Sequence, residues 1–333
     1  MKKIVKKVLN YIKDEYKFLI FCSIILFLGL FHLPYNLYVG GGIISLEKRL
    51  EVENAYEQKG SINISYVRSL SATIPTYLLS YIFNWEREDI ESIKVDSHDN
   101  SQAIWEREKL FLQEANDNAI ISAYRLAGED IKINKELLKI LYIVEGSDTD
   151  LEIGDTLLSI DGINITQYED LEEIIKNKNI GDKINIKYLR DNQEKQGYAV
   201  VQEIANEKKA GFYLMKLFDY DVNKKVTLKF NNREGGSSAG FMVSLAIYNQ
   251  LTKFDITKGR KIVGTGTIDS EGHVGSIGGV KYKLSGAVSG NADLFFVPEE
   301  NYEEALQAKK EKKYDITIVP VKTLEEAVEY LKR

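Results

Sequence analysis

The chain of 333 residues carries 44 lysines and arginines against 50 aspartates and glutamates, so its net charge is −6. Its length allows two domains beside a short terminal segment, and 44% hydrophobic residues are typical of a folded protein. The acidic balance argues against a nucleic-acid partner. The single cysteine excludes disulfides and the three scattered histidines offer no metal-ligand spacing, so we expect neither a metal nor a cofactor.

The N-terminal segment differs from the rest of the chain. Residues 1–17 contain six lysines against Asp14 and Glu15, and an uncharged, apolar run follows from Phe18. A membrane-spanning helix needs roughly 20 residues, which predicts a transmembrane anchor over residues 18–38. The lysines before this run and the acidic chain after it place the basic segment 1–17 in the cytoplasm and the body outside, at the cell membrane.

Two other interpretations of this run are open. Gly40-Gly-Gly42 can serve as the cleavage site of a signal peptide, although the apolar stretch is long and the small residues come late. The run can also be a buried core helix, but the lysine flank and the lack of amphipathic alternation count against this. We therefore expect the anchor, and in the anchor and signal-peptide interpretations alike the body leaves the cytoplasm.

The chain between the glycines and residue 130 predicts a strand and two helices. Polar and apolar residues alternate over 62–66, as in a half-buried strand. The apolar stretch 71–83 predicts a helix around Pro75. Residues 100–128 predict one long helix, because apolar residues recur at helical spacing and Gly128 is a suitable C-terminal stop.

Short strands and tight turns follow from about residue 131. Asp161-Gly162 between alternating apolar residues predicts a hairpin over 157–165, since Asp-Gly favours two-residue hairpin turns. The other elements that we predict in this region are a strand over 137–144, a helix over 168–176, and strands over 183–189 and 198–201.

The stretch Glu152-Ile-Gly-Asp-Thr-Leu-Leu-Ser-Ile-Asp-Gly162 resembles the signature of bacterial PDZ domains. The resemblance covers residues 131–203. It implies a β-rich module that binds extended peptides by adding a strand to a sheet edge. The alternative is an unrelated β-rich domain that contains an Asp-Gly turn.

An α/β pattern begins after Gln202. A strand over 226–230 leads into Glu234-Gly-Gly-Ser-Ser-Ala-Gly240, and an apolar helix over 239–251 follows. A strand over 261–268 precedes Gly278-Gly-Val-Lys281. The remaining predicted elements are helices over 281–288, 299–309 and 324–331, and strands over 294–297 and 316–319.

Ser238 lies where a strand gives way to a helix through Gly235-Gly236. Glycines allow a sharp turn and the close approach of a substrate carbonyl. The free N–H groups and the positive end of the helix dipole suit an oxyanion, and a serine hydroxyl becomes a nucleophile when a neighbouring base takes its proton. Ser238 is therefore our candidate nucleophile.

Lys281 is our candidate base. A lysine holds its proton to about pH 10 in water, so it acts near neutrality only when burial favours its neutral form. Apolar neighbours at 277, 280 and 284 predict such burial for Lys281. Lys283 lies two residues on, towards a different face of the helix, so we do not expect both lysines in one site.

Each signal taken alone has an ordinary explanation. A Gly-Gly-Ser-Ser run is usually a turn, and a lysine at a helix start is usually solvated. His273 is another possible base, but its polar turn, Ser270-Glu-Gly-His273, predicts an exposed side chain. Ser237 competes formally with Ser238.

Together, Gly236-Ser-Ser-Ala-Gly240 and Gly278-Gly-Val-Lys-Tyr-Lys283 resemble the catalytic runs of the Lon-type serine proteases. The spacing between the two residues (281 − 238 = 43) is similar to that in the family. Thr265-Gly-Thr-Ile268, Leu294-Phe-Phe-Val-Pro298 and Gly60-Ser-Ile-Asn-Ile64 fit the same pattern. The resemblance implies a serine–lysine peptidase with Ser238 as nucleophile and Lys281 as base. It also implies a possible homo-oligomer, because Lon-like domains tend to form rings.

The resemblance further implies an α/β (α+β) Lon-type proteolytic domain, over residues 45–130 and 204–333, with the PDZ domain 131–203 inserted. Anchor, PDZ and protease together resemble the membrane-anchored, ATP-independent proteases of Gram-positive bacteria, one branch of which processes secreted pheromones. The ATP-dependent members usually read Asp-Gly-Pro-Ser-Ala-Gly, whereas this chain has Gly235 and Ser237 at the Asp and Pro positions. The sequence has no GxxxxGK[ST], so we expect no ATPase motor and a flexible peptide as substrate.

Two other functions compete with the surface endopeptidase. In a signal-peptidase-like protease the serine follows the membrane segment closely, whereas Ser238 lies far beyond it. A non-catalytic PDZ adaptor at the cell surface is the alternative from a different class. The presence of both motif residues argues against the adaptor.

Overall fold

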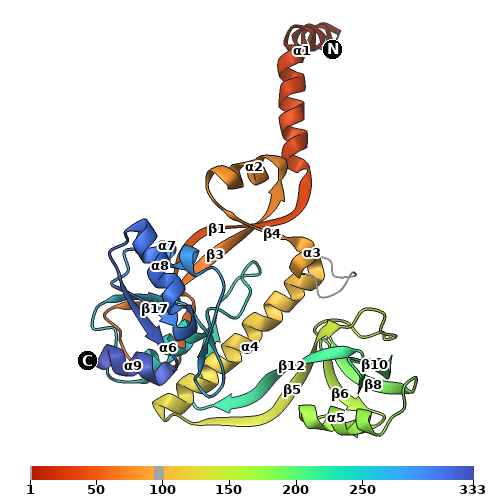
Figure 1. Cartoon of the computed structure of the whole chain (residues 1–333), viewed down its shortest axis with the longest axis vertical. Coiled ribbons are helices and arrows are strands. Elements are labelled where there is room, and N and C mark those ends of the chain that lie inside the picture. Colours follow the sequence, from red (N-terminus) through yellow and green to blue (C-terminus); the bar gives the residue numbers. More distant parts are fainter. Residues whose placement is uncertain (1, 94–100) are drawn as a thin grey trace. The chain divides into compact units, whose positions relative to one another are not determined.

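The computed structural model describes residues 2–93 and 101–333 (Figure 1). Its described residues divide into two compact units, one within Met1–Gly40 and Val67–Ile93, and the other within Gly41–Tyr66 and Lys94–Arg333. The first position of the predicted basic segment 1–17 and the first position of the predicted helix 100–128 lie outside the described residues.

In the first unit, the helix that we predicted to run to residue 38 is shorter than expected. Helix α1 (Lys2–Leu30) ends eight residues earlier than residue 38, and strand β1 (His32–Ser45) follows. Pro34 explains the end, because proline and the residue before it disfavour an α-helix. No helix in the described part of the chain is long and apolar enough to cross a membrane.

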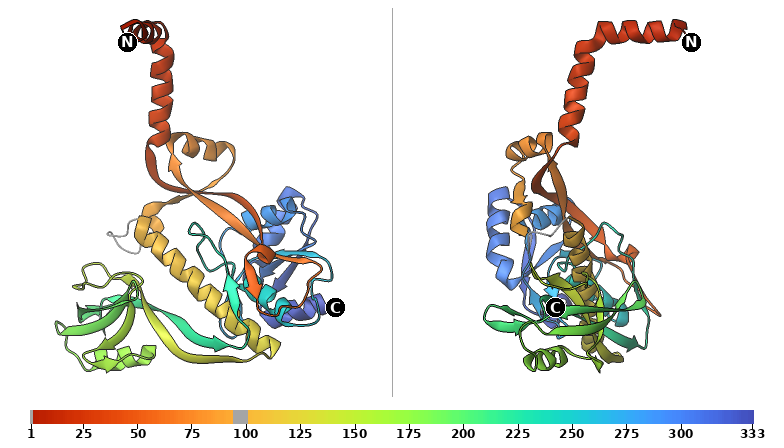
Figure 2. Two further views of the ribbon diagram at one scale, coloured as in Figure 1. Left: turned by 180° about the vertical axis from the view of Figure 1, so that it is seen from behind. Right: turned by 90° about the vertical axis from the view of Figure 1, so that its right-hand side faces the viewer.

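The rest of the first unit is built on β1 and the end of strand β3 (Ser61–Thr73). Pro75 stands in the first turn of helix α2 (Ile74–Ile82), which is therefore shorter than the predicted 71–83. Strand β4 (Glu86–Asp89) pairs antiparallel with β1, and α3 (Ile90–Ile93) follows. The views in Figures 1 and 2 place α2 beside the C-terminal end of α1.

The second unit contains a parallel sheet in the order β18-β17-β14-β3. Consecutive residues along each strand are buried on opposite faces of the sheet, as in a sheet that is covered on both sides. Ile262 and Phe296 belong to one core, and Val263 and Phe295 to the other. These strands are β14 (Lys261–Gly264), β17 (Leu294–Pro298) and β18 (Thr317–Val321).

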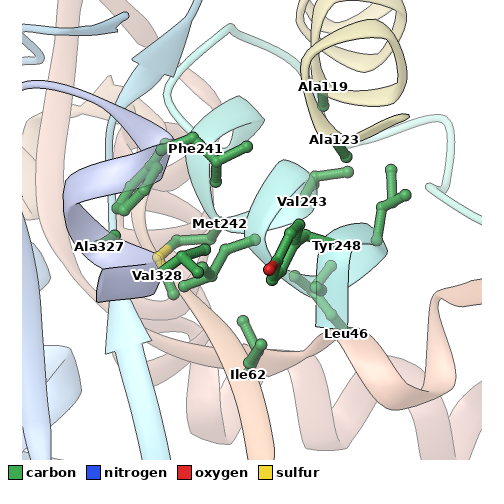
Figure 3. Close-up of a cluster of buried hydrophobic side chains, with 14 of the residues drawn as sticks. Leu46, Ile62, Ala119, Ala123, Phe241, Met242, Val243, Tyr248, Ala327 and Val328 are labelled. Atoms are coloured by element: carbon green, nitrogen blue, oxygen red, sulfur yellow. The ribbon is translucent and has the colours of Figure 1, made fainter. Parts of the chain in front are cut away.

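Helices cover both faces of this sheet. One core unites α4 (Ser101–Ala127), α6 (Gly240–Leu251) and α9 (Leu324–Lys332), and in Figure 3 Phe241 and Met242 lie against α9 while Val243 faces Ala119 and Ala123 of α4. The other core contains α7 (Val280–Ser289) and α8 (Tyr302–Lys312). The predicted long helix and the predicted helices 239–251, 281–288 and 324–331 are thus confirmed, with ends shifted by a residue or so.

The β-rich region forms an antiparallel sheet in the order β12-β5-β6-β8-β9 with its own core. The predicted hairpin turn is confirmed, since Asp161 and Gly162 both have positive φ, 48° and 82°. The Arg190 side chain donates two hydrogen bonds to the buried Asp155 carboxylate, at 2.7 and 2.6 Å, which fixes the Gly-Asp turn of the PDZ signature. The elements are β5 (Ile131–Ile143), β6 (Thr156–Ile160), β7 (Ile163–Asn164), α5 (Tyr168–Lys176), β8 (Lys183–Arg190), β9 (Gln193–Val200) and β12 (Phe212–Val222).

The antiparallel ribbon of β5 and β12 joins the two regions. At one end Ile131 and Val222 pack against the core of the parallel sheet. At the other end Ile140 and Phe212 belong to the core of the β-rich region. Between them Leu217 packs with the α4 residue Leu110 and its neighbours. The β-rich region is therefore inserted through two paired strands.

Several short elements complete the second unit. The strand predicted over 261–268 is interrupted at Thr265 and Gly266, so only its ends form β14 and β15 (Thr267–Ile268). Strand β13 (Val226–Leu228) pairs with β2 (Leu50–Val52). The predicted helix 299–309 begins as the 3₁₀ turn η2 (Glu299–Asn301) before α8. The others are η1 (Leu46–Lys48), β10 (Gln202–Ile204), β11 (Glu207–Lys209) and β16 (Val274–Gly275).

Candidate active site

Ser238 lies in the loop between β13 and α6, two residues before the first residue of α6. Its carbonyl oxygen accepts hydrogen bonds from the Gly266 N–H at 2.9 Å and the Thr265 hydroxyl at 3.0 Å. The Phe241 N–H returns a bond to the Gly266 carbonyl at 3.1 Å. The interruption of the predicted strand at Thr265 and Gly266 therefore serves to hold the serine loop.

The N-terminus of α6 presents free donors next to the serine. In the part of the chain that the structure describes, the N–H groups of Ser238 and Ala239 donate to no other group of the protein. All twelve residues of α6 are buried, so the helix cannot shift easily. Unpaired N–H groups at a helix start attract negative charge, which is the chemistry of an oxyanion site.

The two glycines before the serine lie directly against Glu108 of α4. The Gly236 N–H donates to the Glu108 carbonyl at 2.9 Å, and Gly236 has a φ of 86° that side-chain-bearing residues rarely adopt. A Cβ on Gly235 would lie 2.9 Å from the Cβ of Glu108, and one on Gly236 would lie 3.1 Å from its Oε2. The glycine pair thus gives Glu108 the room to pack on the serine loop.

Gly240 has a separate packing reason. A Cβ there would lie 3.0 Å from Ile268 and 3.3 Å from the Cβ of Ala115. The glycine therefore lets the first turn of α6 approach both α4 and β15. Ser238 therefore lies between two points of close packing, one at Gly235 and Gly236 and the other at Gly240.

Lys281 is the second residue of α7, and Gly279, with a φ of 72°, precedes the helix. The Asn301 side chain holds the preceding turn, because it accepts from the Ile277 N–H at 2.9 Å and donates to its carbonyl at 3.0 Å. The Lys281 ammonium lies 4.8 Å from the centre of the Tyr282 ring.

The predicted burial of Lys281 is wrong. Lys281 is exposed, and Lys283 is the buried lysine of this helix, with 5% of its surface accessible. Val280 and Leu284, two of the apolar residues that suggested burial, lie on the side of α7 that packs against α8 and the sheet, and Lys283 is buried with them. Burial lowers the pKa of Lys283 to about 8, against a weaker opposing effect of Glu304.

The structure does not join Ser238 to Lys281 by a hydrogen bond. Over the described ranges, 2–93 and 101–333, the Ser238 hydroxyl forms no hydrogen bond within the chain. The prediction that His273 is exposed is confirmed, and its ring lies 2.8 Å from the Asp269 carboxylate in the same turn.

Three half-buried carboxylates of α4 were not predicted. Burial raises the pKa of Glu108, Glu114 and Asp117, the last to about 6. The Asp117 carboxylate also accepts from the Phe218 N–H at 3.4 Å. The only sequence signal for them was the stripe of alanines on α4, because residues beside a buried stripe are themselves partly covered.

Comparisons with known proteins address the identity of both regions. Residues 227–332 match the family model of the Lon protease (S16) C-terminal proteolytic domain, and residues 138–198 match that of the PDZ domain. The chain therefore contains a Lon-type proteolytic domain and a PDZ domain. Ser238 and Lys281 both fall inside the Lon-type match. The predicted outer limits, 45–130, 131–203 and 204–333, stay predictions.

Two curated relatives, both named as Lon proteases, match about a third of this chain or less. A Lon protease of Trichlorobacter lovleyi is 33% identical over 93 residues, which cover 28% of this chain and 11% of that protein. An archaeal Lon protease of Methanocaldococcus jannaschii is 33% identical over 114 residues, or 33% of this chain and 16% of that protein. The chain thus spans less than a fifth of the length of these two relatives.

Among solved structures, the PDZ domain of an SdrC-like protein from Listeria monocytogenes is similar to part of this chain. It is 21% identical, covers 25% of this chain and 92% of that domain, and has a TM-score of 0.23. The PDZ assignment therefore rests on the family model and not on this likeness.

Proposed function

We propose that the chain is a serine endopeptidase in which Ser238 is the nucleophile and Lys281 the general base. The observation that carries this proposal is the position of Ser238. It stands at the start of α6 beside two unpaired N–H groups, inside the segment that matches the Lon proteolytic domain. Lys281 stands at the start of α7 within the same match.

The reaction follows from these groups. The neutral Lys281 amine takes the proton of the Ser238 hydroxyl while its oxygen attacks the peptide carbonyl. The Ser238 and Ala239 N–H groups bind the resulting oxyanion. The Lys281 ammonium then gives its proton to the leaving amine, which yields an acyl-serine ester. Water, deprotonated by Lys281, hydrolyses the ester and frees Ser238.

The exposure of Lys281 sets a requirement on this mechanism. A lysine loses its proton near neutrality only where water is excluded. Bound substrate or a neighbouring subunit must therefore cover Lys281 during the reaction. A ring of subunits, as the resemblance to Lon implies, is one way to provide this cover.

The substrate class follows from what accompanies the site. The sequence has no P-loop that would bind ATP, so we propose that the enzyme acts without ATP on flexible peptides or exposed segments. We propose that the PDZ domain holds such peptides. A deletion that joins Leu138 to Lys216, which pair across the β5–β12 ribbon, by a two-residue turn removes the domain. Unchanged substrate range and rate in this variant would refute capture by the PDZ domain.

We also propose that α1 associates with a membrane through its apolar part and that the body of the protein lies outside the cytoplasm. The support is its apolar part, in which residues around the whole helix are exposed, among them Phe21, Leu26 and Phe27. Flotation of the full chain with lipid vesicles tests the association. Protease accessibility of the body in intact cells tests its side.

The decisive experiment compares wild type with Ser238→Ala and Lys281→Ala on an unstructured protein without ATP, with products identified by mass spectrometry. Ser237→Ala is the matched control for the serine. We expect cleavage by wild type and Ser237→Ala, and none by the other two. Cleavage that survives in Ser238→Ala would show that the nucleophile is wrong.

A non-catalytic PDZ adaptor is the second candidate, and the exposure of Lys281 favours it. An adaptor would bind peptides equally well in wild type, Ser238→Ala and Lys281→Ala. It would cleave in none of them. The same set of variants therefore separates the two functions.

A further inference from the structure

Helix α2 exposes an apolar surface in the first unit. Its members, which we call the α2 patch, are aliphatic and aromatic side chains that are more than a third exposed, and Ile82 reaches 72%. A contiguous exposed apolar surface marks an interaction site. The α2 patch consists of Leu70, Leu78, Leu79, Tyr81, Ile82 and Phe83.

The segment that carries the patch has no charged residue from Ser69 to Trp85. Several backbone N–H groups at the two ends of α2 nevertheless have partners within the chain. Thr73 and Thr76 form a capping box at the start of α2, and the Phe83 and Trp85 N–H groups bond to carbonyls of the last turn. An apolar medium requires such internal partners, so these ends of α2 are compatible with lipid.

The α2 patch continues onto α1. The two helices contact each other, and Figures 1 and 2 place α2 at the C-terminal end of α1, where Leu30 and Phe31 are at least half exposed. The apolar surface therefore extends over one side of α2 and around a single helix. A groove on another protein cannot readily cover the exposed side of α2 and also surround α1, whereas lipid can.

Aromatic side chains lie in this surface and next to it in the chain. The rings of Tyr35 and Tyr77 lie 5.0 Å apart, and the ring of Trp85 stacks on that of Phe83 at 5.5 Å. The guanidinium of Arg87 lies 4.1 Å from the centre of the Tyr81 ring. Tyrosine and tryptophan are enriched at the level of lipid headgroups, and arginines there keep their charge in water.

We propose that the α2 patch inserts into the headgroup boundary of a lipid bilayer beside α1, as a second membrane contact. This inference rests on the proposed association of α1 with a membrane. Partial insertion of an apolar helix face reaches about 5–10 Å into the boundary region. The patch adds a contact that fixes the unit against the bilayer surface, which one helix alone does not.

Trp85 provides a native reporter, because the chain has only one other tryptophan, Trp105. The full chain with Trp105→Phe is added to phosphatidylcholine and phosphatidylglycerol vesicles with or without brominated lipid. We expect brominated lipid to remove at least about half of the Trp85 emission, since the ring would lie within about 10 Å of the boundary. Ile82→Asp, at an exposed position, should abolish this loss while the chain still floats with the vesicles. Ile180→Asp, at an exposed position of the second unit, is the control and should change nothing.

Three results would overturn the inference, and they have different meanings. Flotation without quenching of Trp85 would leave the α1 contact intact and refute the α2 contact. Concentration-dependent cross-linking through α2 without quenching would show that a second copy of the chain covers the patch. Failure to float would refute the α1 association and the α2 contact together, and would leave the proposed peptidase untouched.

Discussion

The loop before α6, which carries Ser238 and which we call the serine loop, and the loop before α7, which leads to Lys281 and which we call the lysine loop, have the same local pattern. Each has a glycine pair before a helix, but their surroundings differ. At the serine loop, added Cβ atoms on Gly235 and Gly236 would meet Glu108, and the loop is tied to Thr265 and Gly266. At the lysine loop, nothing lies within 4 Å of a Cβ on Gly278. The serine is thus held from several sides, while the lysine next to its open loop is exposed. Identical short motifs do not imply equally preorganised sites.

The largest expected effect separates the two lysines of α7. We expect Lys281→Met to lower peptidase activity by at least about 10³-fold, as the loss of a base does in other serine peptidases. Lys283→Met should retain most of the activity, because Lys283 lies on the buried side of the helix. Rates on an unstructured protein measure both. The reverse ranking would make the buried Lys283 the base.

A second prediction concerns the folding stability that is lost because Lys283 is buried. Its folded pKa of about 8 is below its ordinary value of 10.5, so the folded state pays the full cost of burying the charge below pH 8. This cost is relieved as the pH rises from 8 to 10.5. Lys283→Met should therefore be more stable than wild type by up to about 3 kcal/mol at pH 7, and the gain should fade towards pH 10.5. Thermal unfolding at both pH values measures it, and a pH-independent difference would contradict the cause.

A third prediction restores the aspartate of the ATP-dependent motif. Gly235→Asp should destabilise the chain by about 1–3 kcal/mol, because its Cβ would lie 2.9 Å from that of Glu108. Glu108→Gly, which removes the Cβ that the new side chain meets, should recover part of this loss in the double variant. A double-mutant cycle by chemical unfolding measures the coupling. Additive effects would show that Glu108 does not occupy the place of the aspartate.

The smallest expected effect compares two glycines. Gly236→Ala forces a φ of 86° on a residue with a side chain, so we expect a loss of about 1–2 kcal/mol in stability and about tenfold in activity. Gly278→Ala should be nearly neutral in both, because its surroundings are open. Equal losses in the two variants would remove the contrast between the loops.

Local features of the fold were predictable from sequence. The helix over 168–176 has the predicted ends, and the Asp161-Gly162 hairpin forms, because both depend on residues that are close in the chain. The position of Ser238 at the start of α6 was predictable for the same reason. Proline at 34 was visible too, but the apolar run outweighed it in the prediction of a helix to residue 38.

Burial was less predictable, because it depends on partners far apart in the sequence. Whether Lys281 or Lys283 is covered depends on which side of α7 meets α8. The contact of Glu108 with Gly236 joins residues more than a hundred positions apart, across the inserted PDZ domain. The spacing of residues along one helix does not contain this information.

The paired strands β5 and β12 also bear on the order of folding. An unfolded insert of about 80 residues between Leu138 and Lys216 would cost roughly 4 kcal/mol in loop entropy when the protease half closes around it. A folded PDZ domain already holds those two positions side by side as strand partners. The PDZ domain should therefore fold before the protease half and act as a template that brings α4 and the serine loop together.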